Sequence, residues 1–420
     1  MIKKTIKQLW NERRSNLLIG LELLVVSVFL WYTVDELLRD YKRFSMPLGF
    51  DISHVYYVEL SSIPSESPDY VEATDEIATV GADFLTIIDR LRLNPDIEYV
   101  GYTSGIHFHY RWSNRYTSFQ VDTAIVPQGF VRPVGSSYFD LFQVKTADGG
   151  SPQLLIEALE RGEIVVTKRV AEKFFGNAAN AIGKDISCID QGDTESRVYR
   201  IGGVCEDQRY NEFSSYDYAY YQLISASEVR NTNSLGYPLF IRTKPVADKK
   251  DFPEKFRKEM ESQLKIGNIY LKNIQPMSER RSEHIRSWID GMRMNIAVVV
   301  FFLLNVFLGV IGTFWLRTQQ KRGEIGLRIA LGSTRKSIFG MLLSQGVIIL
   351  VIAFLIGAVI FCNFWFTGVL NAVTWVDTTY RLVIGMGMTF ALLLVMICIG
   401  ISFPAYRAMK EKPAEALHYE

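Results

Sequence analysis

The stretch RTQQKRGEIGLRIALGSTRK (residues 317–336) and the forty uncharged residues from Ser337 to Val376 decide the fold. The basic stretch carries six Lys or Arg residues against the single acid Glu324. The uncharged run is long enough to cross a bilayer, because a hydrocarbon core of roughly 30 Å needs about 20 apolar helical residues. The pairing therefore predicts a short, ordered, positively charged loop directly before a membrane span.

Three further segments predict membrane-spanning helices. Residues 294–316 and 382–406 contain no charged side chain, and residues 17–34 are interrupted only by Glu22. The chain as a whole is 48% hydrophobic, so the local concentration of apolar residues carries this prediction. The basic start before residue 17 is also typical of a cleaved signal peptide. No small-x-small cleavage motif follows it, so we expect a retained helix.

The positions of Lys and Arg predict the orientation. The first 14 residues carry five basic side chains against Glu12, and the loop 317–336 carries six. By the positive-inside rule both lie in the cytoplasm, and four spans then place both chain ends there. The basic flank before residue 294 opposes this orientation, but it ends a loop far longer than the roughly 60 residues over which the rule holds.

The sequence thus predicts an α-helical integral membrane protein with a large α+β extracytoplasmic domain between its first and second spans. Within that domain, strands at 163–167 and 198–204 and helices at 70–94 and 169–175 alternate. Charged, proline-free segments at both of its ends predict helical stalks, with interfacial amphipathic helices as the alternative. The expected boundaries are a cytoplasmic segment 1–16, spans 17–34, 294–316, 338–366 and 382–404, the extracytoplasmic domain 35–293, a coupling loop 317–337, an outer loop 367–381 and a cytoplasmic tail 405–420.

Motifs of catalysis are missing from the sequence. It contains no GxxxxGK[ST] phosphate loop, no GxSxG and no HExxH. We therefore expect no catalytic residue and no bound cofactor in this chain, which disfavours a membrane-anchored periplasmic enzyme. His107 and His109 have the spacing of metal ligands on one strand face, but no third ligand is near, and a surface aromatic strand is the simpler interpretation.

Two polar features leave alternatives open. Glu22 lies inside the first span, where a carboxylate is costly and usually faces the bundle interior. It is a candidate intramembrane polar site, through a hydrogen bond between helices, a place at the interface or a role in proton coupling. Cys188 and Cys205 flank residues 189–204 in an oxidising compartment and are candidates for a disulfide across a hairpin.

Residues 321–333 (KRGEIGLRIALGS) resemble the cytoplasmic signature of FtsX-like permeases of ABC transporters, the MacB group. The ending FPAYRA (403–408) with PAEALHYE (413–420) is similar to the ending of that family, and residues 163–204 resemble its periplasmic core. The resemblance implies a permease of the bacterial inner membrane that relays the closure of an ATPase to its periplasmic domain. In MacB an ATPase domain precedes the first span. Only 16 residues do so here, so we expect a separate ATPase subunit to hold ATP and Mg²⁺.

The resemblance also implies partners and cargo. The partners are the ATPase subunit, a second copy or a paralogous permease, membrane lipid and, for export, a periplasmic adaptor with an outer-membrane channel; no nucleic acid is expected. The cargo is a peptide, drug, lipid or lipoprotein. The alternative is a non-transporting regulator of a periplasmic cell-wall hydrolase, as among FtsX-type relatives.

The loop 317–337 predicts a short coupling helix. A helix from Glu324 to Leu331 presents an apolar ridge over two turns, and Gly332 ends it. We expect the ridge to enter a groove of the ATPase while basic side chains pair with acids at the rim. The alternative is a basic helix lying on anionic lipid, which explains the charges but less well the Glu-Ile-Gly-Leu core. The candidate docking residues are Lys321, Glu324, Ile325, Leu327, Arg328 and Leu331.

Overall fold

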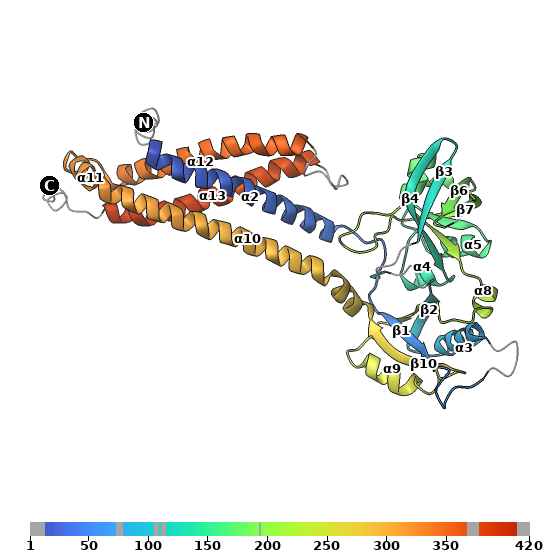
Figure 1. Ribbon diagram of the computed structural model, residues 1–420. Coiled ribbons are helices and arrows are strands. Elements are labelled where there is room, and N and C mark those ends of the chain that lie inside the picture. The colour runs from blue at the N-terminus through green and yellow to red at the C-terminus, as the bar shows by residue number, and fades with distance from the viewer. Residues whose placement is uncertain are drawn as a thin grey trace. The chain divides into compact units, whose positions relative to one another are not determined.

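A computed structural model describes residues 13–72, 79–104, 109–110, 115–192, 195–367 and 378–409 (Figure 1). The chain divides into two compact units. Residues up to Phe44 and from Trp288 onward form the helical unit, and Ser45–Ser287 form the α+β unit. This is the predicted architecture, with an α+β domain inserted between the first and second long helices.

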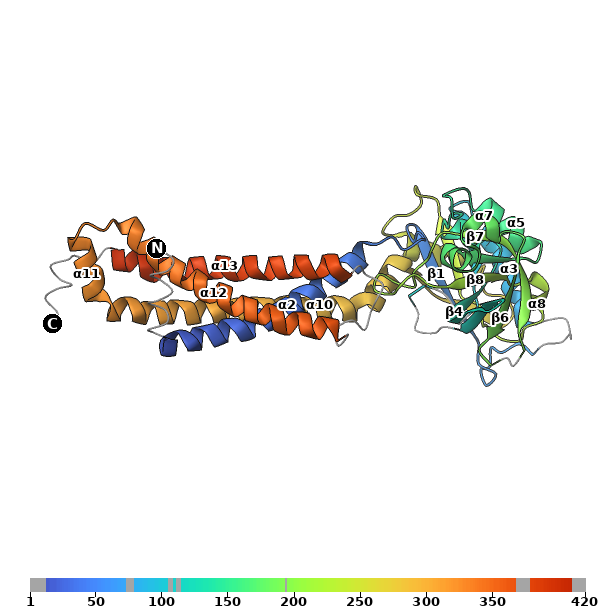
Figure 2. The same cartoon turned by 90° about the horizontal axis from the view of Figure 1, so that it is seen from above.

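Among its described residues, the helical unit contains four helices that are long and apolar enough to cross a membrane. In both views these helices lie alongside one another within the unit, and a short fifth helix, α11, follows α10 (Figures 1 and 2). Their bounds confirm the predicted number of spans. The helices that the structure describes here are α2 (Arg13–Ser45), α10 (Met277–Gln320), α11 (Arg322–Ala330), α12 (Arg335–Phe366) and α13 (Thr378–Met409).

Helices α2 and α10 extend well beyond the apolar segments. Helix α2 continues past Val34 to Ser45, and α10 begins at Met277 rather than at residue 294. Neither extension contains proline, which would interrupt the backbone hydrogen bonds. The two charged segments expected as stalks are therefore helical.

Small residues allow the helices of this unit to approach closely. A Cβ atom on Gly346 of α12 would lie 2.3 Å from Cδ1 of Ile401 and 3.1 Å from Cγ2 of Ile397, both on α13. Glycine at such a position lets two backbones come together, as is common between membrane helices. The shared core includes buried apolar residues of all five helices, among them Leu23, Val310, Ile325, Leu350 and Ile397.

In the α+β unit, one lobe is a four-stranded antiparallel sheet in the order β10-β1-β9-β2. Its core is formed by the sheet and by helix side chains such as Phe84, Leu91 and Phe256. Helix α3 is capped by Thr79, whose hydroxyl accepts a hydrogen bond from the Ala82 amide at 3.2 Å. The elements are β1 (Val55–Ser62), α3 (Val80–Arg92), β2 (Ile97–Tyr102), α8 (Ala226–Arg230), β9 (Leu239–Thr243), α9 (Phe252–Met260) and β10 (Ile269–Pro276).

The other lobe is a closed barrel in the order β3-β4-β8-β5-β7-β6. Four of its pairings are antiparallel, whereas β4 with β8 and β5 with β7 are parallel. The elements are β3 (Tyr116–Val121), β4 (Ala124–Val134), α4 (Tyr138–Leu141), α5 (Gln153–Glu160), β5 (Ile164–Thr167), α6 (Lys168–Phe175), α7 (Ala178–Ala181), β6 (Asp185–Asp190), β7 (Arg197–Cys205) and β8 (Ala219–Leu223).

The predicted helices and strands of this unit are confirmed, except that one helix begins later in the chain than expected. The strands expected at 163–167 and 198–204 are β5 and β7, and the helix expected at 169–175 is α6. Gly176 ends α6 with φ of 82°, a left-handed conformation that glycine adopts without strain. The helix expected at 70–94 is shorter and begins only at Val80.

Candidate functional site: the coupling helix and a buried polar network

Helix α11 forms within the basic stretch 317–336. It runs from Arg322 to Ala330 with Lys321 at its N-cap and Leu331 at its C-cap. Gly332 follows with φ of 92°, and the Ser333 amide donates to the Arg328 carbonyl at 2.9 Å. The helix therefore ends just before Gly332, as the sequence predicted.

The outer face of α11 combines two leucines with an ion pair. Leu327 is 50% exposed and Leu331 is 79% exposed. On the same helix, Arg328 Nη2 lies 2.6 Å from Glu324 Oε1, one helical turn away, and both side chains are nearly half exposed. These four side chains form what we call the α11 outer face: Glu324, Leu327, Arg328 and Leu331.

The structure corrects one candidate docking residue. Ile325 is only 2% exposed and belongs to the core that includes Phe314 of α10 and Ala405 of α13. Positions 325 and 327 are roughly 200° apart around an α-helix, so they cannot both face outward. Ile325 therefore holds α11 against the bundle and is not part of the exposed ridge.

Glu22 lies at a contact between α2 and α10. A Cβ atom on Gly309 would lie 2.4 Å from Oε1 of Glu22, so the carboxylate occupies the space that the missing side chain leaves. The structure thus places Glu22 between two helices. The hydrogen bond between helices, the place at the interface and the role in proton coupling stay predictions for Glu22.

Cys188 and Cys205 are both buried and free, so the structure does not form the candidate disulfide. Cys188 of β6 is paired with Arg197 of β7, eight positions before Cys205. Eight strand residues span roughly 26 Å, whereas a disulfide needs Cα atoms within about 7 Å. The register of the hairpin therefore keeps the two sulfur atoms apart.

His109 is a buried ring rather than an exposed one. Its Nε2 lies 2.8 Å from the Tyr138 hydroxyl, and its ring stacks on Phe50. Burial lowers the pKa of His109 well below its ordinary value. His107 lies outside the described residues, and within the described ranges no three His, Cys, Asp or Glu side chains are grouped as metal ligands.

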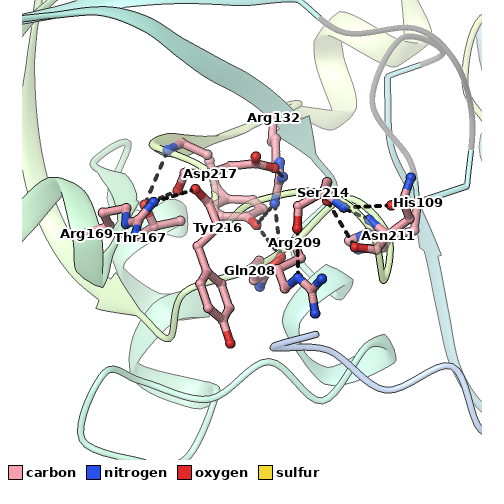
Figure 3. A network of polar contacts seen from close by, with 12 residues as sticks. His109, Arg132, Thr167, Arg169, Gln208, Arg209, Asn211, Ser214, Tyr216 and Asp217 are labelled. Atoms are coloured by element: carbon pink, nitrogen blue, oxygen red, sulfur yellow. Dashed lines mark hydrogen bonds and ion pairs between the residues drawn. The ribbon is translucent and has the colours of Figure 1, made fainter. Parts of the chain in front are cut away.

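A buried polar network that the sequence analysis did not find lies around the loop between β7 and β8 (Figure 3). Arg132 of β4 pairs with Asp217 at 2.6 Å, and both side chains are buried. Arg132 also donates to Gln208 at 3.1 Å and to the Tyr221 hydroxyl at 2.6 Å. Burial raises the pKa of Asp217 to about 6, although Arg132 opposes this shift. In the sequence, the one sign of this network is Arg132, a single charged residue within the apolar strand FVRPV (130–134).

Arg209 fixes the same loop to the chain segment that follows α2. Its buried guanidinium donates to the carbonyls of Met46 at 3.0 Å and Ser214 at 2.9 Å, and to that of Glu212. The Arg209 amide donates to the Leu48 carbonyl at 3.0 Å. The loop 206–217 is therefore held rigidly from inside.

Comparison with known families decides what kind of protein carries these features. Residues 25–259, more than half the chain, match the MacB-like periplasmic core domain. Residues 296–413 match the FtsX-like permease C-terminal domain, which includes α11. The chain belongs to the MacB/FtsX-like permease family. The α+β unit of this permease is accordingly its periplasmic domain, as the sequence predicted.

Two solved structures are similar to part of this chain at low identity. The periplasmic region of MacB from Actinobacillus actinomycetemcomitans is 13% identical, covers 59% of this chain and 98% of its own, and has a TM-score of 0.34. The extracellular domain of the ABC-type transporter YknZ from Gram-positive bacteria is 14% identical, covers 52% of this chain and 100% of its own, and has a TM-score of 0.30. No curated protein matches this permease.

Proposed function

We propose that this permease is the membrane subunit of an ABC transporter of the bacterial inner membrane. It couples ATP hydrolysis by a separate ATPase subunit to movement of its periplasmic domain, for export or extraction of a peptide, drug, lipid or lipoprotein. ATP and Mg²⁺ bind to the ATPase, and the permease itself performs no chemistry. It works beside a second copy or a paralogue.

The observation that carries the proposal is the α11 outer face. Burying a fully exposed leucine contributes about 1.5–3 kcal/mol. Leu331 at 79% exposure can supply most of that amount to a complex and Leu327 at 50% about half of it. The exposed ion pair between Glu324 and Arg328 contributes little to folding, so both groups are available to a charged rim. Ile325 ties the same helix to α10 and α13, so a displacement of α11 reaches the spans.

Charged substitutions on the outer face test this docking. In the double variant Leu327→Asp, Leu331→Asp, an ATPase groove would have to bury unpaired carboxylates, which costs several kcal/mol. We expect at least a hundredfold loss of ATPase recovered with the tagged permease from its own membranes. The measurement is affinity purification, with the ATPase recognised in mass spectra by its phosphate-loop sequence.

Lys336→Ala is the control for this experiment, because an exposed charge at the end of the loop contributes about 0–1 kcal/mol. The lipid-anchor alternative expects removals of Arg and Lys to weaken membrane association about equally and the leucine variant to keep its ATPase. Undiminished ATPase recovery with the double variant, correctly inserted, would rule out docking by this face.

We also propose that both chain ends and α11 lie in the cytoplasm. Single cysteines in a background without the four native ones report this orientation. A membrane-impermeant maleimide applied to spheroplasts should label Cys at Ser227, an exposed residue of the α+β unit, and spare Cys at Ser333 beside α11. After the cells are opened both should react. Labelling of position 333 from outside would contradict the four-span orientation.

A further inference from the structure

The loop 206–217 contacts the first turns of α10 through two buried polar side chains of the α+β unit. Asn211 Nδ2 lies 3.1 Å from Nε2 of His284, which is on α10. His284 is 7% exposed and Asn211 is 4% exposed, so water does not compete for this contact. A buried contact between two nitrogen atoms is stable only if one of them donates a hydrogen and the other accepts it.

The orientation of the Asn211 amide is fixed by the loop itself. Its Oδ1 accepts hydrogen bonds from two backbone amides, that of Phe213 at 2.8 Å and that of Ser214 at 2.9 Å. Asn211 and Ser214 lie side by side in Figure 3. The backbone N–H of Asn211 donates to Ser214 Oγ at 3.0 Å, which ties the same turn together. Flipping the side-chain amide would turn its NH₂ group toward two N–H donors. The NH₂ group must therefore face His284.

This orientation determines the protonation state of His284. Because Asn211 donates, Nε2 of His284 must accept, so the ring is neutral and carries its proton on Nδ1. A proton on Nε2 would set two donors against each other and place a cation in a buried site. The contact exists only with the neutral imidazole.

Aromatic rings and an ion pair lie around His284. Among the described residues, the Tyr210 and Tyr110 rings flank the imidazole at 5.5 and 5.9 Å between centroids. The buried Glu212 carboxylate accepts from Arg281 Nε, one turn earlier on α10, and from the Tyr110 hydroxyl at 3.3 Å. Burial lowers the pKa of His284, and the Glu212 carboxylate, which already pairs with Arg281, opposes this shift without outweighing it.

We propose that His284 and Asn211 form an acid-released clasp, which holds the start of α10 against loop 206–217 at neutral pH and opens when His284 takes up a proton. Arg209 and Asp217 keep the loop in place, so opening separates α10 from the loop. Burial lowers the pKa of His284 in the closed state, so the open state binds the proton more strongly. The opening equilibrium therefore rises by roughly tenfold per pH unit once the pH falls below the ordinary pKa of a histidine. The clasp follows from hydrogen-bond geometry and does not depend on the proposed function.

Hydrogen exchange of the full chain in lipid nanodiscs tests the clasp. Peptides covering 206–217 and 277–287 are compared between the natural protein and His284→Gln at pH 7.5 and at pH 5. Gln keeps a carbonyl acceptor for Asn211 but does not titrate, and comparison at equal pH cancels the chemical exchange rate. At pH 7.5 we expect equal protection. At pH 5 the natural protein should exchange at least about tenfold faster in both segments, with α3 unchanged.

Two further variants make the test decisive. His54→Gln removes a histidine paired with Asp248 elsewhere in the unit and should leave the acid effect intact. Asn211→Asp keeps acceptors for the two backbone amides but offers His284 an acceptor, so protonation should now tighten the clasp and the acid effect should reverse. Equal protection at both pH values in the natural protein, persistence of the acid effect in His284→Gln, or an unchanged direction in Asn211→Asp would each overturn the proposal.

Discussion

Replacing Ile325 by Asp should cost the permease on the order of 4 kcal/mol of unfolding free energy, because it buries an unpaired carboxylate and removes a core side chain. Asp at Leu327, two residues later, should leave the fold intact. Ile325 is 2% exposed and Leu327 50% exposed on the same nine-residue helix. The two variants place the same charge on opposite faces.

The measurement is the thermal unfolding midpoint of the purified full chain in detergent, together with the yield of folded protein. Ile325→Val is the matched control, since it removes one methyl group and should cost about 1 kcal/mol. Equal stability of Ile325→Asp and Leu327→Asp would show that α11 does not pack on the bundle through Ile325. The pair also separates loss of docking from loss of folding, because only Leu327→Asp should lose the ATPase while remaining stable.

The orientation of α11 shows what sequence can decide and what it cannot. Apolar residues alternate through Ile325, Leu327, Ile329 and Leu331. On a helix this places 325 and 329 on one side and 327 and 331 on the other, so both sides are equally apolar. Only the presence of α10 and α13 decides that the isoleucines face inward. The existence and end of the helix are local properties and could be predicted.

The four spans were predictable for the same reason, because contiguous apolar sequence needs no distant partner to form a membrane helix. The start of α3 was not. Val71 is held outside any helix by Asn268, whose side chain accepts from the Val71 amide and donates to its carbonyl, both at 2.9 Å. These two residues are 197 positions apart in the chain. No local pattern contains that information.

The polar network in the barrel could not be predicted either, because its residues are also far apart in the chain. Arg132 and Asp217 come together because β4 and β8 pair in parallel, with Arg132 opposite Tyr221. The register that joins them also separates Cys188 from Cys205, which the sequence offered as a pair. Residue types restrict the candidates, but strand order and register select among them.

Arg132→Met should cost the periplasmic domain about 3–5 kcal/mol of unfolding free energy, since it leaves the Asp217 carboxylate buried without its partner. It also removes the donor to Gln208 and Tyr221. For a domain of this size we expect the thermal midpoint to fall by roughly 10 °C. Lys272→Met is the matched control, because Lys272 pairs with Glu59 at 2.8 Å on the surface, and its midpoint should not change.

The pH dependence of the Arg132→Met defect identifies its cause. Burial already raises the pKa of Asp217 to about 6 from an ordinary 3.8, so ionising this carboxyl costs stability as the pH rises through that value. Without Arg132 the pKa in the folded state rises further, and the cost at pH 7.5 grows. At pH 5 the carboxyl is protonated in the folded variant, so the deficit should be clearly smaller than at pH 7.5. A deficit of equal size at both pH values would assign the damage to lost packing of the arginine stem rather than to an uncompensated buried charge.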